Sequence, residues 1–157
     1  MKKIVLLLLA LSLSLFGANQ IKTGSKVSEL NTYSFETPQG KSLKIQASPK
    51  LIIIAFEKDT AAFVNEYLNS KTPPYLPKHR ALFIADIHAM PSIISRMFAL
   101  PKLRKYRHII YLHYQDEFQN VIPNKEDEVT LLHVQNGQIT NITFAKNKQE
   151  LQDAIER

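Results

Sequence analysis

The stretch Val129-Thr-Leu-Leu-His-Val-Gln-Asn-Gly-Gln-Ile139, which continues to Phe144, decides the fold of this chain. Apolar residues lie on both sides of Asn136-Gly137, a dipeptide that readily takes the positive φ angles of a tight two-residue turn. The segment therefore predicts an antiparallel β-hairpin built from residues 129–134 and 139–144.

Upstream of this hairpin, apolar strand-like runs alternate with segments of helical spacing. The runs are continuously apolar and rich in β-branched residues, which is typical of strands covered on both faces. The predicted strands are 51–56, 81–87 and 108–114, and the predicted helices are 60–69, 91–100 and, at the end of the chain, 148–156. Strands that alternate with helices predict a parallel sheet, and the final hairpin turns it into a mixed one.

Prolines and a capping residue mark the ends of these elements. Asp59 is placed to cap the helix over 60–69, and Pro91 occupies the favoured first position of the next helix. Pro101, directly after residues 91–100, is predicted to break or kink that segment. Residues 71–78 contain three prolines and are predicted to form an irregular loop.

Two further segments complete the organisation of the chain. Apolar and polar residues alternate in 33–37 and 42–45 around Pro38-Gln-Gly-Lys41, which predicts an N-terminal β-hairpin. Residues 1–18 have the pattern of a secretory signal peptide, because Lys2 and Lys3 precede a short apolar run that ends in small residues. Cleavage is expected after Gly17 or Ala18. This leaves one domain, 19–157, with no second apolar stretch of membrane length.

Composition excludes several classes of function. The chain has no cysteine, so it can form no disulfide, carry no lipid on a cysteine and perform no thiol–disulfide exchange. A net charge of +6, to which the leader contributes two lysines, is too mild to imply nucleic acid as a partner. Glycine-rich nucleotide fingerprints and a Gly-x-Ser-x-Gly nucleophile elbow are both absent.

The order hairpin, strand, helix, strand, helix, strand, hairpin, helix resembles the thioredoxin-like superfamily. It is most similar to the peroxiredoxin and exported thiol-oxidoreductase branch, in which the N-terminal hairpin has a turn like Gly40-Lys41. The segment Val129–Ile139 resembles the family segment that runs from a cis-proline through a strand and an Asn-Gly turn. The resemblance implies a three-layer α/β/α fold with a central mixed sheet and an N-terminal hairpin.

Two departures from the family pattern limit what the resemblance implies for function. The family places a Cys-x-x-Cys pair after the first buried strand, where this chain has Phe56-Glu-Lys-Asp-Thr-Ala-Ala62. The cis-proline that helps to hold substrate peptides is replaced by Val129, and a cis bond before a residue other than proline costs about 3–4 kcal/mol. We therefore expect a redox-inactive member of the fold with a trans bond before Val129.

Acidic residues follow the predicted parallel strands, and three more precede the antiparallel strand that begins at Val129 at the same edge. Parallel strands end at the same edge of a sheet, which is also where ligands bind in open α/β folds. Eight of the fourteen acids are therefore expected at that edge: Glu57, Asp59, Asp86, Asp116, Glu117, Glu126, Asp127 and Glu128. Basic residues precede the strands, so the opposite edge is expected to be positively charged.

A divalent-cation site is one interpretation of the acidic edge. Glu57, Asp59, Asp86 and His88 combine carboxylates with an imidazole, a set that suits manganese, zinc or iron. The alternative, which we favour, is that these acids are solvated and mark the ends of loops and helices.

His113 and His133 lie within predicted strands. A pair of histidines on adjacent strands would ligate haem or a metal. We favour the alternative that they are hydrogen-bonded residues at the edge of the core, because buried histidines are seldom ligands.

The most individual segment of the chain is Asp86–Ser92 with the stretch that follows it. Backbone N–H groups at this strand-to-helix turn would receive an anion. Residues 95–107 mix apolar and basic side chains and would dock on a partner or an anionic lipid surface. The interpretation that we favour is an amphipathic helix with Met97, Phe98 and Leu100 in the core.

The sequence as a whole favours an exported, redox-inactive binding or accessory module in the bacterial periplasm, with a protein or peptide partner. Its predicted binding residues are Glu57, Asp59, Asp86, His88 and Val129, and no cofactor is predicted. The alternative is a metal- or cofactor-dependent periplasmic oxidoreductase, with flavin or haem left open, that uses the acidic edge.

Overall fold

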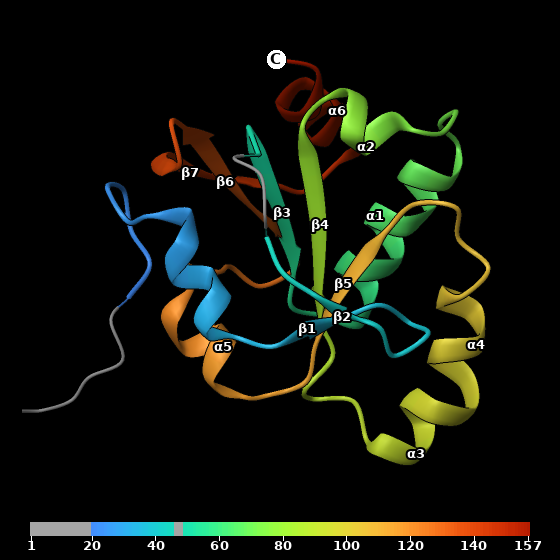
Figure 1. The fold of residues 1–157 in the computed structure, drawn as a ribbon. Coiled ribbons are helices and arrows are strands. Elements are labelled where there is room, and N and C mark those ends of the chain that lie inside the picture. Colours follow the sequence, from blue (N-terminus) through green and yellow to red (C-terminus); the bar gives the residue numbers. More distant parts are fainter. Residues whose placement is uncertain (1–19, 46–48) are drawn as a thin grey trace, which may run out of the picture.

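The computed structural model describes residues 20–45 and 49–157. The predicted leader, residues 1–18, lies outside the described residues. A seven-stranded mixed sheet runs through the centre, with the strand order β2-β1-β5-β4-β3-β6-β7 (Figure 1). Among the described residues, no helix is both long and apolar enough to cross a membrane.

Three parallel strands form the middle of the sheet, as the apolar runs predict. They are β3 (Leu51–Ala55), β4 (Ala81–Asp86) and β5 (Ile110–His113). β4 pairs in parallel with β3 on one side and with β5 on the other. Every residue of β3 is buried, because helices or loops cover both faces of the sheet here.

The C-terminal hairpin is confirmed. β6 (Val129–Gln135) pairs antiparallel with β3 and with β7 (Gln138–Ala145). Asn136 and Gly137 both have positive φ angles, 51° and 75°, as a tight turn of this kind requires.

The closing helix α6 (Lys148–Glu156) has the predicted bounds and a clear N-terminal cap. The side chain of Asn147 accepts a hydrogen bond from the Glu150 amide at 2.9 Å. This bond satisfies one of the amides that the first helical turn leaves without a partner.

Substitution of Asn147 by alanine is expected to lower the free energy of unfolding by about 1 kcal/mol, because the Glu150 amide loses its acceptor. Asn147→Asp, which keeps a side-chain acceptor, is the matched control and is expected to change stability little. Urea unfolding of the three proteins measures the difference. Equal losses for both variants would contradict the capping role.

The N-terminal hairpin is also confirmed, although its strands are shorter than predicted. β1 (Phe35–Glu36) and β2 (Ser42–Leu43) pair antiparallel, and β1 then joins the sheet beside β5. Gly40 has a φ of 83° in the turn, where its amide donates to the Thr37 carbonyl at 2.8 Å. A 3₁₀ helix, η1 (Val27–Thr32), precedes the hairpin and was not predicted.

One prediction about the helix that follows β3 is wrong, and so is one about the loop after it. α1 spans Lys58–Asn69, so Glu57 and not Asp59 is the N-cap residue. The Thr60 hydroxyl accepts from the Glu57 amide at 3.3 Å and donates to the Glu57 carbonyl at 3.0 Å, which starts the helix before Thr60. The proline-rich stretch after α1 is not irregular throughout, because α2 (Tyr75–Lys78) forms within it.

Of the two alternatives predicted for Pro101, a break or a kink, the break does not occur. The segment runs as α3 (Ser92–Ile94), a π-helical stretch η2 (Ser95–Ala99) and α4 (Leu100–Leu103). The π-helical stretch ends just before the turn that contains Pro101, a residue that cannot donate a backbone hydrogen bond. The chain therefore stays helical to Leu103.

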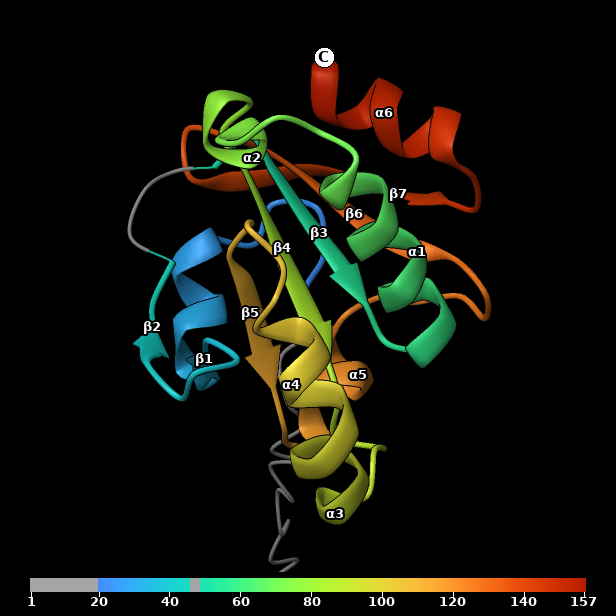
Figure 2. The same ribbon diagram turned by 90° about the vertical axis from the view of Figure 1, so that its right-hand side faces the viewer.

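Two cores lie on opposite faces of the sheet, which gives the predicted three layers (Figure 1). Figure 2 views the sheet from the side of α1 and α4. α1, α2 and α6 place side chains in one core, and α4 packs at its edge. η1 and the short helix α5 (Glu117–Val121) place theirs in the other. The chain thus has a thioredoxin-like three-layer arrangement, and both cores end at the edge where β3, β4 and β5 finish.

Candidate functional site

The carboxyl edge of the parallel strands brings the predicted acidic residues to one end of the molecule. β3, β4 and β5 all end there, and β6 begins there, because Ile54 pairs with Thr130 in the antiparallel register. The side chains that follow these strands nevertheless have separate roles.

Glu57 and Asp59 are both engaged in or near the start of α1. The two carboxylate oxygens of Glu57 accept from the Asp127 amide at 3.3 and 3.2 Å, which ties α1 to the loop before β6. Asp59 is exposed in the first helical turn, where a negative charge is favourable. For these two residues the structure supports the interpretation as helix-end residues.

Asp86 and His88 lie in direct contact. Oδ1 of Asp86 accepts from the His88 amide at 3.0 Å and lies 3.0 Å from Nδ1 of the His88 ring. The Asp86 side chain is fully buried, whereas the His88 side chain is 12% exposed. Asp86 therefore fixes the orientation of an imidazole at the border of the solvent.

The structure adds His113 to this pair, which sequence reasoning missed. Asp86 and His113 are register partners on β4 and β5, and Nδ1 of His113 lies 3.7 Å from Oδ1 of Asp86. His113 is fully buried, with its ring centroid 4.6 Å from that of Phe118. The only sequence signal was that both residues end neighbouring parallel strands.

The predicted hydrogen-bonded environment of His113 is wrong. Neither ring nitrogen of His113 has a hydrogen-bond partner among the described residues, and neither does Oδ2 of Asp86. Unsatisfied buried polar atoms are rare. His133, by contrast, is half-buried and its Nε2 lies 2.7 Å from the Thr143 hydroxyl. β4 and β3 separate the strands of the two histidines, so they form no pair.

No group of three or more histidine, aspartate or glutamate side chains in residues 20–45 and 49–157 is placed to hold a metal ion. The four predicted ligands divide into two sets. Asp86 and His88 are together, while Glu57 is bonded to the β6 loop and Asp59 is directed to solvent in the first turn of α1.

A large apolar groove lies at this same edge, between α1 and the α3–α4 segment. Its volume is about 680 Å³. Phe56, Ala61 and Ala62 line it from the side of α1, and the facing wall comes from the α3–α4 segment. That wall contains Ile94, Phe98, Leu103 and Tyr106, and Ile87 and Met90 complete the lining. The groove is the carboxyl-edge crevice in which open α/β sheets bind ligands.

Val129, the fifth predicted binding residue, does not line this groove. It is fully buried on β6, opposite Ala145 of β7, and belongs to the core. Residues 20–45 and 49–157 contain one cis peptide bond, Pro73-Pro74, so the bond before Val129 is trans as expected.

A second hollow, of about 640 Å³, adjoins the groove and shares four of its lining residues, Ile87, Ala89, Met90 and Pro91. Glu36 of β1 and Tyr114, which follows β5, line it with His88. Burial and a hydrogen bond with Glu36 raise the pKa of the Tyr114 hydroxyl, so this phenol stays protonated. The hollow therefore presents an oriented imidazole, a carboxylate and a neutral phenol to solvent.

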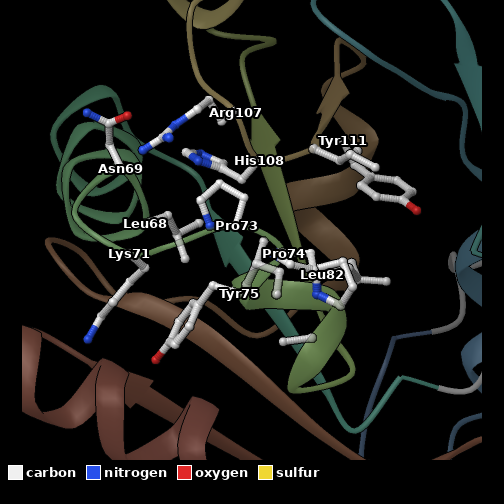
Figure 3. Close-up of a pocket in the computed structure, with 14 residues that line it drawn as sticks. Leu68, Asn69, Lys71, Pro73, Pro74, Tyr75, Leu82, Arg107, His108 and Tyr111 are labelled. Carbon is white, nitrogen blue, oxygen red and sulfur yellow. The ribbon is translucent and has the colours of Figure 1, made fainter.

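A smaller hollow of about 270 Å³ lies at the opposite edge, where β4 and β5 begin (Figure 3). Pro73, Pro74 and Tyr75 line one part of it. Tyr111 of β5 and His108, which precedes β5, line another.

Two titratable side chains beside this smaller hollow, those of Lys71 and His108, are engaged within the protein. The Lys71 ammonium lies 4.6 Å from the Tyr67 ring centroid and 4.0 Å from a Glu156 oxygen. Nε2 of His108 lies 2.8 Å from Oδ1 of Asn65, and burial lowers the pKa of His108 to about 4. We therefore assign this hollow a structural role.

Sequence reasoning missed most of the groove because it placed the apolar side chains of the α3–α4 segment in the core. That prediction is wrong for Met97 and Phe98, which are 64% and 68% exposed, and Leu100 is only half-buried. An amphipathic pattern predicts that an apolar face exists, but not that another element covers it.

No protein-family model matches the chain. No curated protein matches it either.

Solved structures do resemble it. An uncharacterized thioredoxin-like protein from Porphyromonas gingivalis superposes with a TM-score of 0.56 at 15% identity, covering 84% of this chain and 92% of its own. StoA from Bacillus subtilis superposes with a TM-score of 0.51 at 13% identity, covering 78% of this chain and 94% of its own. The chain therefore has a thioredoxin-like fold in which no cysteine is present.

Proposed function

We propose that this chain is an exported, redox-inactive thioredoxin-like protein that acts as a binding module in the bacterial periplasm. Its partner is a protein or peptide, which inserts apolar side chains into the groove between α1 and the α3–α4 segment. The observation that carries the proposal is this groove of about 680 Å³ at the carboxyl edge, next to a helix start that has lost its thiols.

The chemistry of the groove supports binding rather than catalysis. Its walls are mostly aliphatic and aromatic, a composition that favours burial of apolar side chains. Glu57, which caps α1 and lines the groove, already accepts hydrogen bonds from the Asp127 amide. The redox step of the fold needs an attacking thiolate, which this chain cannot supply.

Export rests on the leader-like residues 1–18. Lys2 and Lys3, the short apolar run and the small residues before position 19 are typical of a signal peptide. Because the domain has no cysteine, it forms no disulfide that would require an oxidising compartment. The proposed periplasmic location therefore rests on the leader-like residues alone.

Photo-crosslinking in the native periplasm tests the proposal. A photoreactive residue in place of Ala62, which lines the groove, is expected to give a specific adduct with an envelope protein or peptide. The same residue in place of Asn141, exposed on β7, is the matched control. The adduct should disappear when Ala61→Trp fills the groove. Equal adducts at both positions, or an adduct that survives Ala61→Trp, would contradict the groove as the binding site.

A second candidate is a metal- or cofactor-dependent periplasmic oxidoreductase. The observation that favours it is the buried cluster Asp86–His88–His113, in which three polar atoms lack partners among the described residues. Elemental analysis and a visible spectrum of the untagged protein decide the matter. One equivalent of metal or chromophore that is lost in Asp86→Ala and His88→Ala would favour this candidate. A colourless, metal-free protein would favour the binding module.

A further inference from the structure

The outer face of the α3–α4 segment exposes large apolar side chains. Ile93 is 69% exposed, Met97 64% and Phe98 68%, and Ile94 is 47% exposed. A contiguous group of this kind on a single surface element is a sign of an interaction site, whereas single exposed apolar residues are ordinary.

These side chains form one stripe along the helical segment. Residues four apart lie on nearly the same side of a helix, so Ile93 is followed by Met97 outside the groove. Ile94 is followed by Phe98 and then by Lys102 along the rim of the groove, which these three residues also line. Leu100 and Leu103 lie on the inner side, where they pack against the core. The outer stripe is therefore apolar over its first two turns and ends in a cation.

The segment is also strongly basic in its second half. From Ile87 to Gln115 the sequence contains no aspartate or glutamate, whereas it contains five lysines and arginines. Arg104 is held by a hydrogen bond from its Nε to the Pro38 carbonyl at 2.9 Å. Lys102 and Lys105 are exposed at the C-terminal end of the stripe, whereas Arg107 lines the smaller hollow at the opposite edge of the sheet.

We propose that this stripe is a membrane-docking surface that lies on an anionic phospholipid bilayer. Interfacial helices insert an apolar face among the acyl chains while lysine and arginine approach the negatively charged headgroups. Ile93 and Met97 provide the apolar part, and Lys102 and Lys105 provide the charge.

The charge distribution favours a lipid surface over a second copy of the chain. A second copy of this segment would offer these cations no negative partner, because residues 87–115 contain no aspartate or glutamate, whereas anionic headgroups do. The inference goes beyond the partner-binding groove, because Ile93 and Met97 do not line that groove. Docking would instead hold the groove close to the membrane.

Vesicle co-sedimentation of the exported protein, with its mass showing removal of the leader, tests this inference. Binding is expected to vesicles that contain one third phosphatidylglycerol and to weaken strongly in pure phosphatidylcholine or at high salt. The double variant Ile93→Ser with Met97→Ser should weaken binding by about tenfold or more. Replacing Lys102 and Lys105 with glutamine should weaken it by about fivefold for each cation lost.

Ile109→Ser is the matched control, because Ile109 is 56% exposed outside the stripe and should leave binding unchanged. Equal binding to neutral and anionic vesicles, or equal effects of the stripe and control variants, would overturn the inference. The inference would also be overturned if the protein did not bind vesicles and the stripe variant lost the adduct at position 62. The stripe would then be part of the site for the protein partner. Ala61→Trp should leave vesicle binding intact, so failure of the groove proposal is recognised separately.

Discussion

Replacing Phe118 with alanine is expected to lower the free energy of unfolding by about 3–5 kcal/mol. Phe118 is fully buried on α5, and its ring centroid lies within 6 Å of four other rings. These rings belong to Tyr33, Phe35, Phe56 and His113. The loss is large because the substitution removes buried apolar area and leaves a cavity that these neighbours cannot all fill.

Urea denaturation followed by circular dichroism measures this loss. Phe118→Leu, which keeps most of the apolar volume, should cost clearly less than Phe118→Ala. Ile109→Ala is the surface control and should change stability by less than about 0.5 kcal/mol, because Ile109 is 56% exposed. A loss below about 1 kcal/mol for Phe118→Ala would show that α5 does not pack, as described, in the core that it shares with η1.

Stability is expected to fall as the pH is lowered from about 6.5 to about 4, and His108 is a main cause. Burial lowers the pKa of His108 to about 4 in the folded protein, against an ordinary value of 6.5. Between these values the unfolded chain binds more protons than the folded one, so acid favours unfolding. Because the ring is partly exposed and solvent screens it, we expect this residue to contribute about 1–2 kcal/mol.

His108→Gln isolates the contribution of His108, since glutamine also offers an N–H group to the Asn65 side chain but does not titrate. The difference in unfolding free energy between wild type and this variant should be constant above pH 7 and change in favour of the variant toward pH 4.5. His133, whose pKa is lowered by burial and by Arg157, should produce a residual slope of the same sign in both proteins. A difference independent of pH would contradict a neutral buried His108.

The succession of strands and helices along the chain was predictable because local sequence carries it. Each buried strand is a continuous apolar run, and the Asn136-Gly137 turn specifies the last hairpin by its positive φ angles. α6 also follows from its own sequence, since Asn147 caps it and Leu151 and Ile155 form its buried face.

The ends of other helices were predicted less well, because residue type alone does not say which of several neighbouring residues caps a helix or whether a proline ends it. Aspartate is among the residue types preferred at N-caps, so Asp59 was a reasonable choice. α1 nevertheless begins at Lys58, because the Thr60 hydroxyl forms hydrogen bonds with the backbone of Glu57. Proline inside a helix usually breaks or kinks it. Here Pro101 follows a π-helical stretch, and the segment continues to Leu103.

The site divides in the same way. The sequence places acids after the strands, and the parallel register does bring those strand ends to one edge. Which acids meet is decided by side-chain direction: Asp86 lies on the face of His113, while Glu57 is directed to the loop before β6.

By itself the sequence determined the class of fold, the absence of thiol chemistry and the leader-like start, because patterning and composition need no partner residue to be read. Only the tertiary structure decided that the apolar side chains of α3 and η2 remain uncovered, and that a groove opens between them and α1. Helical periodicity fixes which residues share a face, but whether that face is buried depends on elements distant in the sequence. That difference turns a predicted core helix into the surface on which both proposals for this protein rest.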